Sequence, residues 1–236
     1  MSFNPYEFDR GYASSRGDTL GQYTAKTFLW MVLGLLITFG VAVACWTTPL
    51  YAIYYIPYVH LIVLVATLVI SFTMVRRLER MAVGTAVGLF VLFSALFGVT
   101  MSIYLLVFDL TSVVLCFLLT AVYFGALSAY GFLTKRDLSN LRTILFSGLI
   151  FLIIFGLLSM FIPGLAALDR IVCLVGIAVF LGYTAYDTQK IKAYYNFYSV
   201  SPDMLAKASI FSALQLYLDF INLFLYLLRF LGNRRR

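Results

Sequence analysis

Charged residues are scarce in this chain, and histidine is nearly absent from it. Only 11% of the 236 residues are charged, and His60 is the one histidine. A soluble domain carries about 25% charged residues, so this composition excludes an ordinary soluble fold. A zinc centre needs several histidine, cysteine or acidic ligands, and the three cysteines fall in apolar stretches without metal-type spacing. We therefore expect neither a zinc hydrolase nor a resident cofactor.

Hydrophobic residues make up 63% of the chain and gather in long runs. A helix that crosses a membrane needs about 20 mostly apolar residues. Seven stretches meet or approach that length: 27–46, 58–75, 81–108, 110–133, 143–163, 171–189 and 208–228. We predict an all-α membrane protein with one seven-helix integral membrane domain at 27–231, between a polar N-terminal tail at 1–26 and a basic C-terminal tail at 232–236. The polar tail has no apolar core region, so no cleavable signal peptide is expected.

The distribution of lysine and arginine orients the predicted bundle. Most of the 17 basic residues fall on one side of the membrane if the N-terminus is cytoplasmic, as the positive-inside rule requires. They are spread over short connections, so the net charge of +7 is not a nucleic-acid signal. Five residues are exceptions. One is Arg170, and the other four lie near the C-terminus, which seven spans would place outside: Arg229, Arg234, Arg235 and Arg236. A seventh segment that re-enters the membrane is therefore an alternative to a full span.

Two of the ten acidic residues, Asp187 and Asp219, fall inside predicted spans. An ionised aspartate at the centre of a membrane helix costs about 2.5–3.5 kcal/mol on insertion scales, so such residues are usually paired, inward-facing and functional. Asp187 is near the expected cytoplasmic end of the sixth span, and Asp219 is about 16 Å into the seventh by helical rise. The two spans are consecutive and antiparallel, so their carboxylates meet only if the helices are offset.

Polar residues recur along the seventh span at spacings of three and four. They are Ser212, Gln215, Asp219, Asn222 and Tyr226. This spacing places them on one face of a helix, and lipid cannot satisfy a polar face. We predict that the seventh helix is central or pore-lining, with Ser212, Gln215 and Asn222 beside Asp219. Hydrogen bonding between helices, without transport, is the alternative.

Small residues predict close helix contacts at two places. Gly84 and Gly88 form a GxxxG pair in the third span, and Ala121, Gly125 and Ala129 line one ridge of the fourth. Small residues let the backbones of membrane helices approach closely, so both ridges are expected at helix interfaces.

An aspartate pair in a poorly solvated site has specific chemistry. The two carboxylates cannot both ionise cheaply, so the pair would share a proton and titrate as a unit. Protonated, it would link two helices by a hydrogen bond. Deprotonated, it would repel itself and bind cations, and Ca²⁺ is the hard divalent ion that favours carboxylate oxygens. Arg76 or Arg77, at the cytoplasmic end of the second span, could form an ion pair with Asp187.

Three sequence blocks carry a family resemblance. GYTAYDTQKI at 182–191, LYLDFINLF at 216–224 and TKRDLS at 134–139 closely resemble the Bax-inhibitor family of membrane proteins, also named for its transmembrane Bax inhibitor motif. With the seven hydrophobic segments, the resemblance covers roughly 20–232. The chain is identified as a bacterial member, which implies location in the bacterial cytoplasmic membrane.

The resemblance implies a fold and a function. The family fold wraps two three-helix layers around a central C-terminal helix, and members are similar to pH-sensitive Ca²⁺ leak channels. The family's aspartate sensor maps onto Asp187 and Asp219. A basic residue at the end of the second helix latches the sixth in the closed state, and Arg76, Arg77 and Arg80 are the candidates here. The expected partners are the lipid bilayer and the calcium ion.

Two other functions compete with a channel. Some relatives modulate membrane proteases, so a non-conducting regulator that binds a membrane protease or another partner is the alternative. An intramembrane aspartyl protease also needs two membrane aspartates, and Tyr186-Asp187 resembles its first motif. Its second motif is a Gly-x-Gly-Asp run, whereas Tyr217 and Leu218 precede Asp219. We therefore do not expect an enzyme.

Overall fold

Seven long helices make up most of the described part of the chain, as the hydrophobic segments predict. The computed structural model describes residues 18–48 and 59–235. The helices are α2 (Leu20–Thr47), α3 (Val59–Arg77), α4 (Val83–Val107), α5 (Leu110–Leu133), α6 (Arg142–Phe161), α7 (Asp169–Tyr198) and α8 (Pro202–Leu231), with short 3-10 turns η2 (Ser139–Leu141) and η3 (Pro163–Leu168). Six of them, all except α3, are long and apolar enough to cross a membrane. The predicted all-α membrane fold is confirmed.

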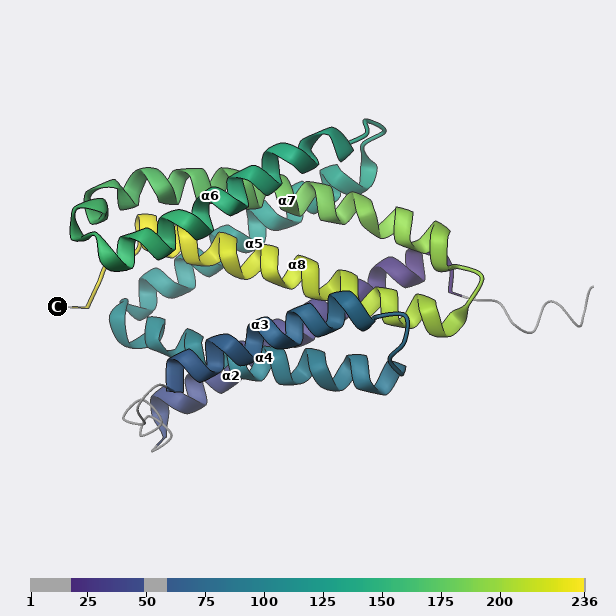
Figure 1. Ribbon diagram of the computed structural model, residues 1–236, viewed down its shortest axis with the longest axis horizontal. Coiled ribbons are helices and arrows are strands. Elements are labelled where there is room, and N and C mark those ends of the chain that lie inside the picture. The colour runs from purple at the N-terminus through teal and green to yellow at the C-terminus, as the bar shows by residue number, and fades with distance from the viewer. Residues whose placement is uncertain (1–17, 49–58, 236) are drawn as a thin grey trace, which may run out of the picture.

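The helices form two groups of three with α8 between them (Figure 1). In one group α4 packs against α2 and α3, and in the other α7 packs against α5 and α6. α8 contacts α2, α4, α5 and α7. Helix α8 is buried on several sides, and its residues Ala213, Leu216, Ile221 and Leu223 are fully buried. The predicted arrangement of two three-helix layers around a central C-terminal helix is confirmed.

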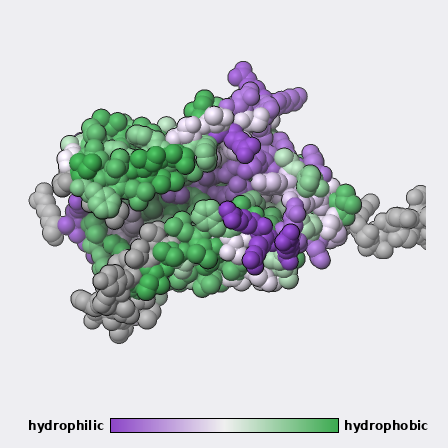
Figure 2. Space-filling view, viewed as in Figure 1, coloured by the Kyte–Doolittle hydropathy of each residue, from purple (hydrophilic) through white to green (hydrophobic). Residues whose placement is uncertain are grey.

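One end of the bundle gathers the basic residues. The α3–α4, α5–α6 and α7–α8 connections and the start of α2 lie at this end (Figure 1). Figure 2 shows hydrophilic residues concentrated there, while the rest of the visible face is mostly hydrophobic. We call it the basic end, defined by Arg76, Arg77, Arg80, Lys135, Arg136, Arg142, Lys190, Lys192 and Lys207. The fold thus gathers these basic residues at one end of the bundle, as the sequence predicts for residues on one side of the membrane.

The first helix begins earlier than predicted. Thr19 caps it through a reciprocal pair of hydrogen bonds with Gln22, an arrangement that satisfies two otherwise free N–H groups. α2 therefore starts at Leu20 instead of residue 27, and Tyr23, predicted to lie in the polar tail, is 1% exposed. The preceding part of that tail, up to residue 17, lies outside the described residues.

The last two helices are also longer than the predicted segments. α7 continues to Tyr198, well past the predicted limit at residue 189. α8 begins at Pro202, behind a Ser201 side chain that accepts a hydrogen bond from the Met204 N–H. It runs as one continuous 30-residue helix, about 45 Å by helical rise. A continuous helix of this length lacks the turn that a re-entrant segment needs and favours a full span.

The C-terminal residues are held against the α4–α5 turn, at the end opposite the basic end. The Asp109 N–H donates to the Asn233 carbonyl and the Arg235 N–H donates to the Val107 carbonyl, each over 2.9 Å. Arg229 pairs with Asp169, and the Arg235 guanidinium lies 5.2 Å from the Trp46 ring centre. Two of the arginines that conflict with the charge rule thus have protein partners.

The predicted small-residue contacts are wrong for the positions named. Gly84, Gly88 and Gly125 face open space instead of a neighbouring helix. The close contacts involve other glycines. A side chain at Gly98 would meet the Thr38 carbonyl 2.7 Å away, and one at Gly131 would overlap the Ala185 backbone. Gly98 therefore sets the α2–α4 spacing and Gly131 the α5–α7 spacing.

Candidate functional site

Both membrane aspartates are buried inside the bundle. Asp187 on α7 is 8% exposed and Asp219 on α8 is 4% exposed. α7 and α8 pack along each other, so the two residues come from neighbouring helices. A buried carboxylate is costly unless it is paired or hydrogen-bonded. The surroundings of each oxygen therefore decide what this site can do.

Asp187 has a basic partner on its own helix. The Lys190 ammonium lies 3.3 Å from Asp187 Oδ1, one helical turn away. The same ammonium is 5.3 Å from the ring centre of Tyr186 and 5.5 Å from that of Tyr194. Aromatic faces attract cations at such distances. Lys190 is thus held by one carboxylate and two rings.

Asp219 lacks such a partner. Its Oδ2 is buried and accepts no hydrogen bond from any described residue. The carboxyl group interacts electrostatically with Asp187 and with Lys190, and Tyr183 interacts with both aspartates. The pair therefore forms one electrostatic unit in which only Asp187 is directly compensated.

The two aspartates sit at different depths. Asp187 lies about 16 Å from the end of α7 at Tyr198, and Asp219 about 25 Å from the start of α8 at Pro202, by helical rise. No hydrogen bond joins the two carboxyl groups among the described contacts. Because α8 begins before residue 208, Asp219 lies deeper than predicted. Contact between the carboxyl groups would require their side chains or the two helices to move.

Some polar side chains of the stripe on α8 have hydrogen-bond partners among the described residues, and others do not. Asn222 donates to the Leu218 carbonyl of its own helix over 2.7 Å. The Tyr226 ring covers Gly176 of α7, where a side chain would come within 2.6 Å of the ring. Ser212 is buried and its Oγ has no described partner, while Gln215 is half-buried. The unsatisfied members are thus Ser212 and Asp219.

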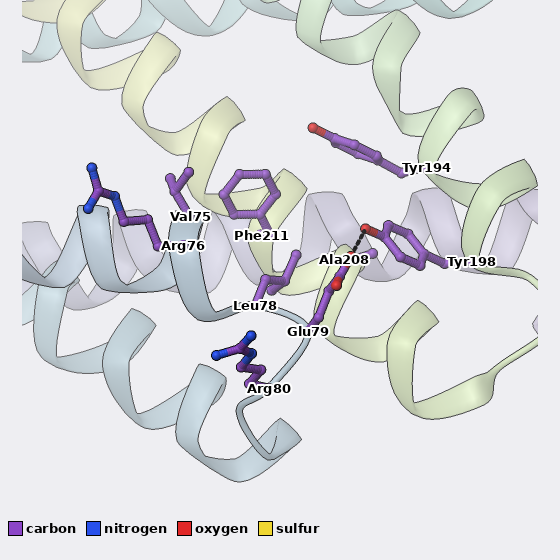
Figure 3. Close-up of a pocket in the computed structure, with 9 residues that line it drawn as sticks. All are labelled: Val75, Arg76, Leu78, Glu79, Arg80, Tyr194, Tyr198, Ala208 and Phe211. Carbon is purple, nitrogen blue, oxygen red and sulfur yellow. Dashed lines mark hydrogen bonds between the residues drawn. The ribbon is translucent and has the colours of Figure 1, made fainter.

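The three arginine candidates for the latch lie at the basic end. All are exposed, and none forms an ion pair with a described residue. Arg76 and Arg80 line a cavity of about 560 Å³ with Glu79, Tyr194 and Tyr198 (Figure 3), and Arg77 lines a neighbouring cavity of about 440 Å³. Asp187 is bonded to Lys190 instead. The arginine latch stays a prediction about another conformation.

The two motif blocks at 134–139 and 182–191 contact each other. Gln189 donates to the Arg136 carbonyl over 2.7 Å and accepts from the Leu138 N–H over 2.9 Å. Within the loop, Ser139 donates two hydrogen bonds to Asp137, which hold the pKa of that carboxyl below its usual range. Gln189 therefore fixes the α5–α6 connection beside the Asp187–Lys190 pair.

Several residues of this region were not predicted from the sequence. Lys190 was visible in principle, because residues three apart on a helix face each other. Tyr183 shares a helix face with Asp187 by its spacing, whereas the buried Lys207 gave no signal that distinguishes it from a loop lysine. Lys207 donates to the Glu79 carbonyl over 3.1 Å and to the Met81 carbonyl over 3.2 Å. These contacts tie the start of α8 to the α3–α4 connection.

The acidic residues alone do not form a full calcium cage. Among the described residues, no group of three or more histidine, cysteine or acidic side chains could hold a metal ion. Ca²⁺ takes six to eight oxygen ligands. Asp187 and Asp219 could therefore supply only part of such a ligand set.

Comparison with known proteins gives a consistent result. A family model described as "Inhibitor of apoptosis-promoting Bax1" matches residues 20–236. The chain is 40% identical over 219 residues to the inner membrane protein YbhL of Escherichia coli strain K12, covering 92% of this chain and 93% of that protein. It is also 40% identical over 220 residues to an uncharacterized protein of Rickettsia prowazekii, covering 92% and 91%.

Proposed function

Because this chain belongs to the Bax inhibitor-1 family of integral membrane proteins, we propose that it is a pH-sensitive calcium leak channel of the bacterial inner membrane. In this proposal Asp187 and Asp219 form the ion-binding and pH-sensing unit. The observation that carries it is the buried Asp219 Oδ2, which has no described hydrogen-bond partner and lies in the field of a second carboxyl group. Such a site is stabilised by a proton or by a cation, and the two compete.

The pH response follows from the groups that face Asp219. Asp187 and Lys190 act on it directly, and Tyr183 adjoins both aspartates. With a proton on the pair, the carboxyl groups can join by a hydrogen bond once α7 and α8 slide into register. Without it, they repel each other and attract a cation. The proposed channel therefore conducts better as the pH rises.

The basic end faces the cytoplasm in this proposal. It gathers the basic residues of three connections, which the positive-inside rule assigns to the cytoplasm. The start of α2 lies at the same end (Figure 1), so the proposal assigns the N-terminal tail to the cytoplasm. Arg76, Arg77 and Arg80 would compete with Lys190 for Asp187 in the closed state.

Calcium flux into proteoliposomes that contain only this protein tests the proposal. Flux should increase between about pH 6 and pH 8, where a coupled carboxyl pair can titrate. Asp219→Asn should remove the pH dependence, because an amide does not titrate. Asp203→Asn is the matched control, since Asp203 is exposed in the first turn of the same helix.

Two results would contradict the proposal in different ways. An unchanged pH profile in Asp219→Asn would exclude the aspartate pair as the sensor. A lack of calcium flux at every pH would exclude the channel and would leave the non-conducting regulator of a membrane protease as the alternative.

A further inference from the structure

A cavity of about 560 Å³ opens at the basic end of the bundle. Its walls are the end of α3 with the turn that follows, the last turns of α7 and the first turns of α8 (Figure 3). Tyr194 and Tyr198 face it from α7, and Phe211 faces it from α8. Tyr198 donates to Glu79 over 3.5 Å across the cavity.

Tyr23 of α2 lies behind this cavity. Its ring centre is 5.7 Å from that of Tyr195. Its hydroxyl lies near those of Tyr194 and Tyr198. It faces the hydroxyl of Ser212, the residue that follows Phe211, closely enough for a weak hydrogen-bond interaction. The hydroxyls of Tyr23 and Ser212 thus continue inward from the cavity wall.

Three buried side-chain atoms lack a hydrogen-bond partner among the described residues: Tyr23 Oη, Ser212 Oγ and Asp219 Oδ2. Ser212 and Asp219 share one face of α8, about 10 Å apart by helical rise, and Gln215 lies between them. A buried polar group without a partner costs about 1–3 kcal/mol. Tyr23 and Ser212 face each other beside residues that line the cavity, and Asp219 lies about two turns further along the same face of α8.

Neighbouring polar groups at similar depth are satisfied. Ser209, one turn before Ser212 on α8, has its Oγ 3.1 Å from that of Thr27. The Tyr217 hydroxyl lies 2.7 Å from the Thr38 hydroxyl, which donates to the Ser94 carbonyl. Beyond Asp219, Asn222 is satisfied by its own helix. Among the described residues, the buried side-chain atoms without a hydrogen bond thus gather at Tyr23, Ser212 and Asp219.

We propose that these groups line a hydrated path by which water, protons and small cations from the basic end reach Asp219. Buried water typically makes about three hydrogen bonds to otherwise unsatisfied groups, and the tyrosine, serine and carboxyl oxygens supply such partners. Tyr23 and Ser212 are positioning residues that line its narrow part. The inference rests on the proposed function, because the path leads to the proposed sensor, and it ends at Asp219.

Cysteine accessibility tests the path without any transport assay. Ser212→Cys and Ser209→Cys are made separately in a chain whose native Cys45, Cys116 and Cys173 are replaced by alanine. Sealed vesicles are treated from each side with a small cationic methanethiosulfonate reagent. Lys135→Cys, at an exposed position of the basic end, shows which side that end faces.

The Ser212→Cys variant should be modified from the same side as Lys135→Cys and roughly tenfold or more faster than Ser209→Cys, since thiol reactivity follows access to solvent. Equal rates for the two serine positions, or modification of Ser212→Cys from the opposite side, would overturn the path. The comparison is internal to one helix, so a general loosening of the bundle would raise both rates together.

Hydroxyl-radical footprinting tests the same path on the unaltered protein. Radicals generated from water label the side chains that water touches. Tyr23 and Tyr217 form a matched pair, since both are buried and differ in whether the hydroxyl has a described partner. Tyr23 should be oxidised several-fold faster than Tyr217, and equal oxidation would contradict the path.

The two proposals can fail separately. Modification of Ser212→Cys in a protein that shows no calcium flux would support the path and refute the channel. Flux with an intact pH response, but without access to Ser212→Cys or oxidation of Tyr23, would support the channel and refute this route to its sensor.

Discussion

The Lys190 ammonium lies 3.3 Å from Asp187 Oδ1, one turn along the same helix. Lys190 is 28% exposed in its side chain and Asp187 is 8% exposed, so the pair joins a partly solvated cation to a buried anion. Asp219 also interacts electrostatically with Lys190. The positive charge of Lys190 therefore favours the ionised form of both Asp187 and Asp219.

Replacing Lys190 should move the pH response of calcium flux. Lys190→Gln removes the cation that favours ionised carboxylates, so a higher pH is needed to deprotonate the pair. The rise in flux should shift to higher pH by roughly one unit or more. Lys192→Gln is the control, because the Lys192 ammonium bonds the Phe132 carbonyl and lies 4.6 Å from that ring centre. An equal shift in both variants would mean that total charge, and not the pair, sets the response.

Adding one methyl group to α5 should have opposite effects at two glycines. Gly131→Ala places a methyl group against the Ala185 backbone of α7 and should destabilise the protein by about 1–3 kcal/mol. Gly125→Ala faces open space and should stabilise α5 by up to about 1 kcal/mol. Thermal unfolding in detergent measures both. A neutral Gly131→Ala would show that α5 and α7 can separate at no cost.

Lys207 should be needed for the α3–α4 connection. Lys207→Met leaves the Glu79 and Met81 carbonyls without this donor, at a cost of about 1–3 kcal/mol. Hydrogen exchange at residues 78–83 should speed up. Lys135→Met, at an exposed loop position, should leave exchange there unchanged. Similar exchange in both variants would show that the connection is held by other contacts.

Two tyrosines should respond differently to loss of the hydroxyl group. Tyr217→Phe removes a bond to Thr38 at the junction of α2, α4 and α8 and should cost about 1–2 kcal/mol of unfolding free energy. Tyr23→Phe removes a hydroxyl that has no described partner. It should cost little stability and should slow calcium flux. Equal losses of stability would argue against a special environment at Tyr23.

The sequence predicts the number and order of the helices because lipid demands long apolar runs. It places the ends of α7 and α8 badly, since Lys190 and Lys192 end the apolar run while the helix continues to Tyr198. Tyr23 was predicted to lie in a polar tail because its neighbours are polar, yet the Thr19 cap draws it into the bundle. Hydropathy identifies the residues that can lie in lipid, whereas a capping residue such as Thr19 determines where the helix begins.

The candidate site was predicted in part for a similar reason. Helical spacing places Ser212 and Asp219 on one face of α8, and their burial agrees with an inward face. Spacing within one helix cannot give the offset between two helices, so the separation of the aspartates was not predictable. Gly84 and Gly88 form a motif that permits close helix packing, but the motif does not show whether another helix packs against it. In the described part of the fold none does at these two positions.

The central position of α8 has a consequence for biosynthesis. α8 is translated after α2, α4, α5 and α7, the helices that it packs against, at about 5–20 residues per second in bacteria and eukaryotes. Until α8 is inserted, Thr38 lacks its hydrogen bond to Tyr217. On the other side of α8, Gly176 lacks the Tyr226 ring that covers it. Before this step, the two three-helix groups can meet only through direct contacts such as Phe39 with Phe117, and insertion of the helix that carries Asp219 completes the core between them.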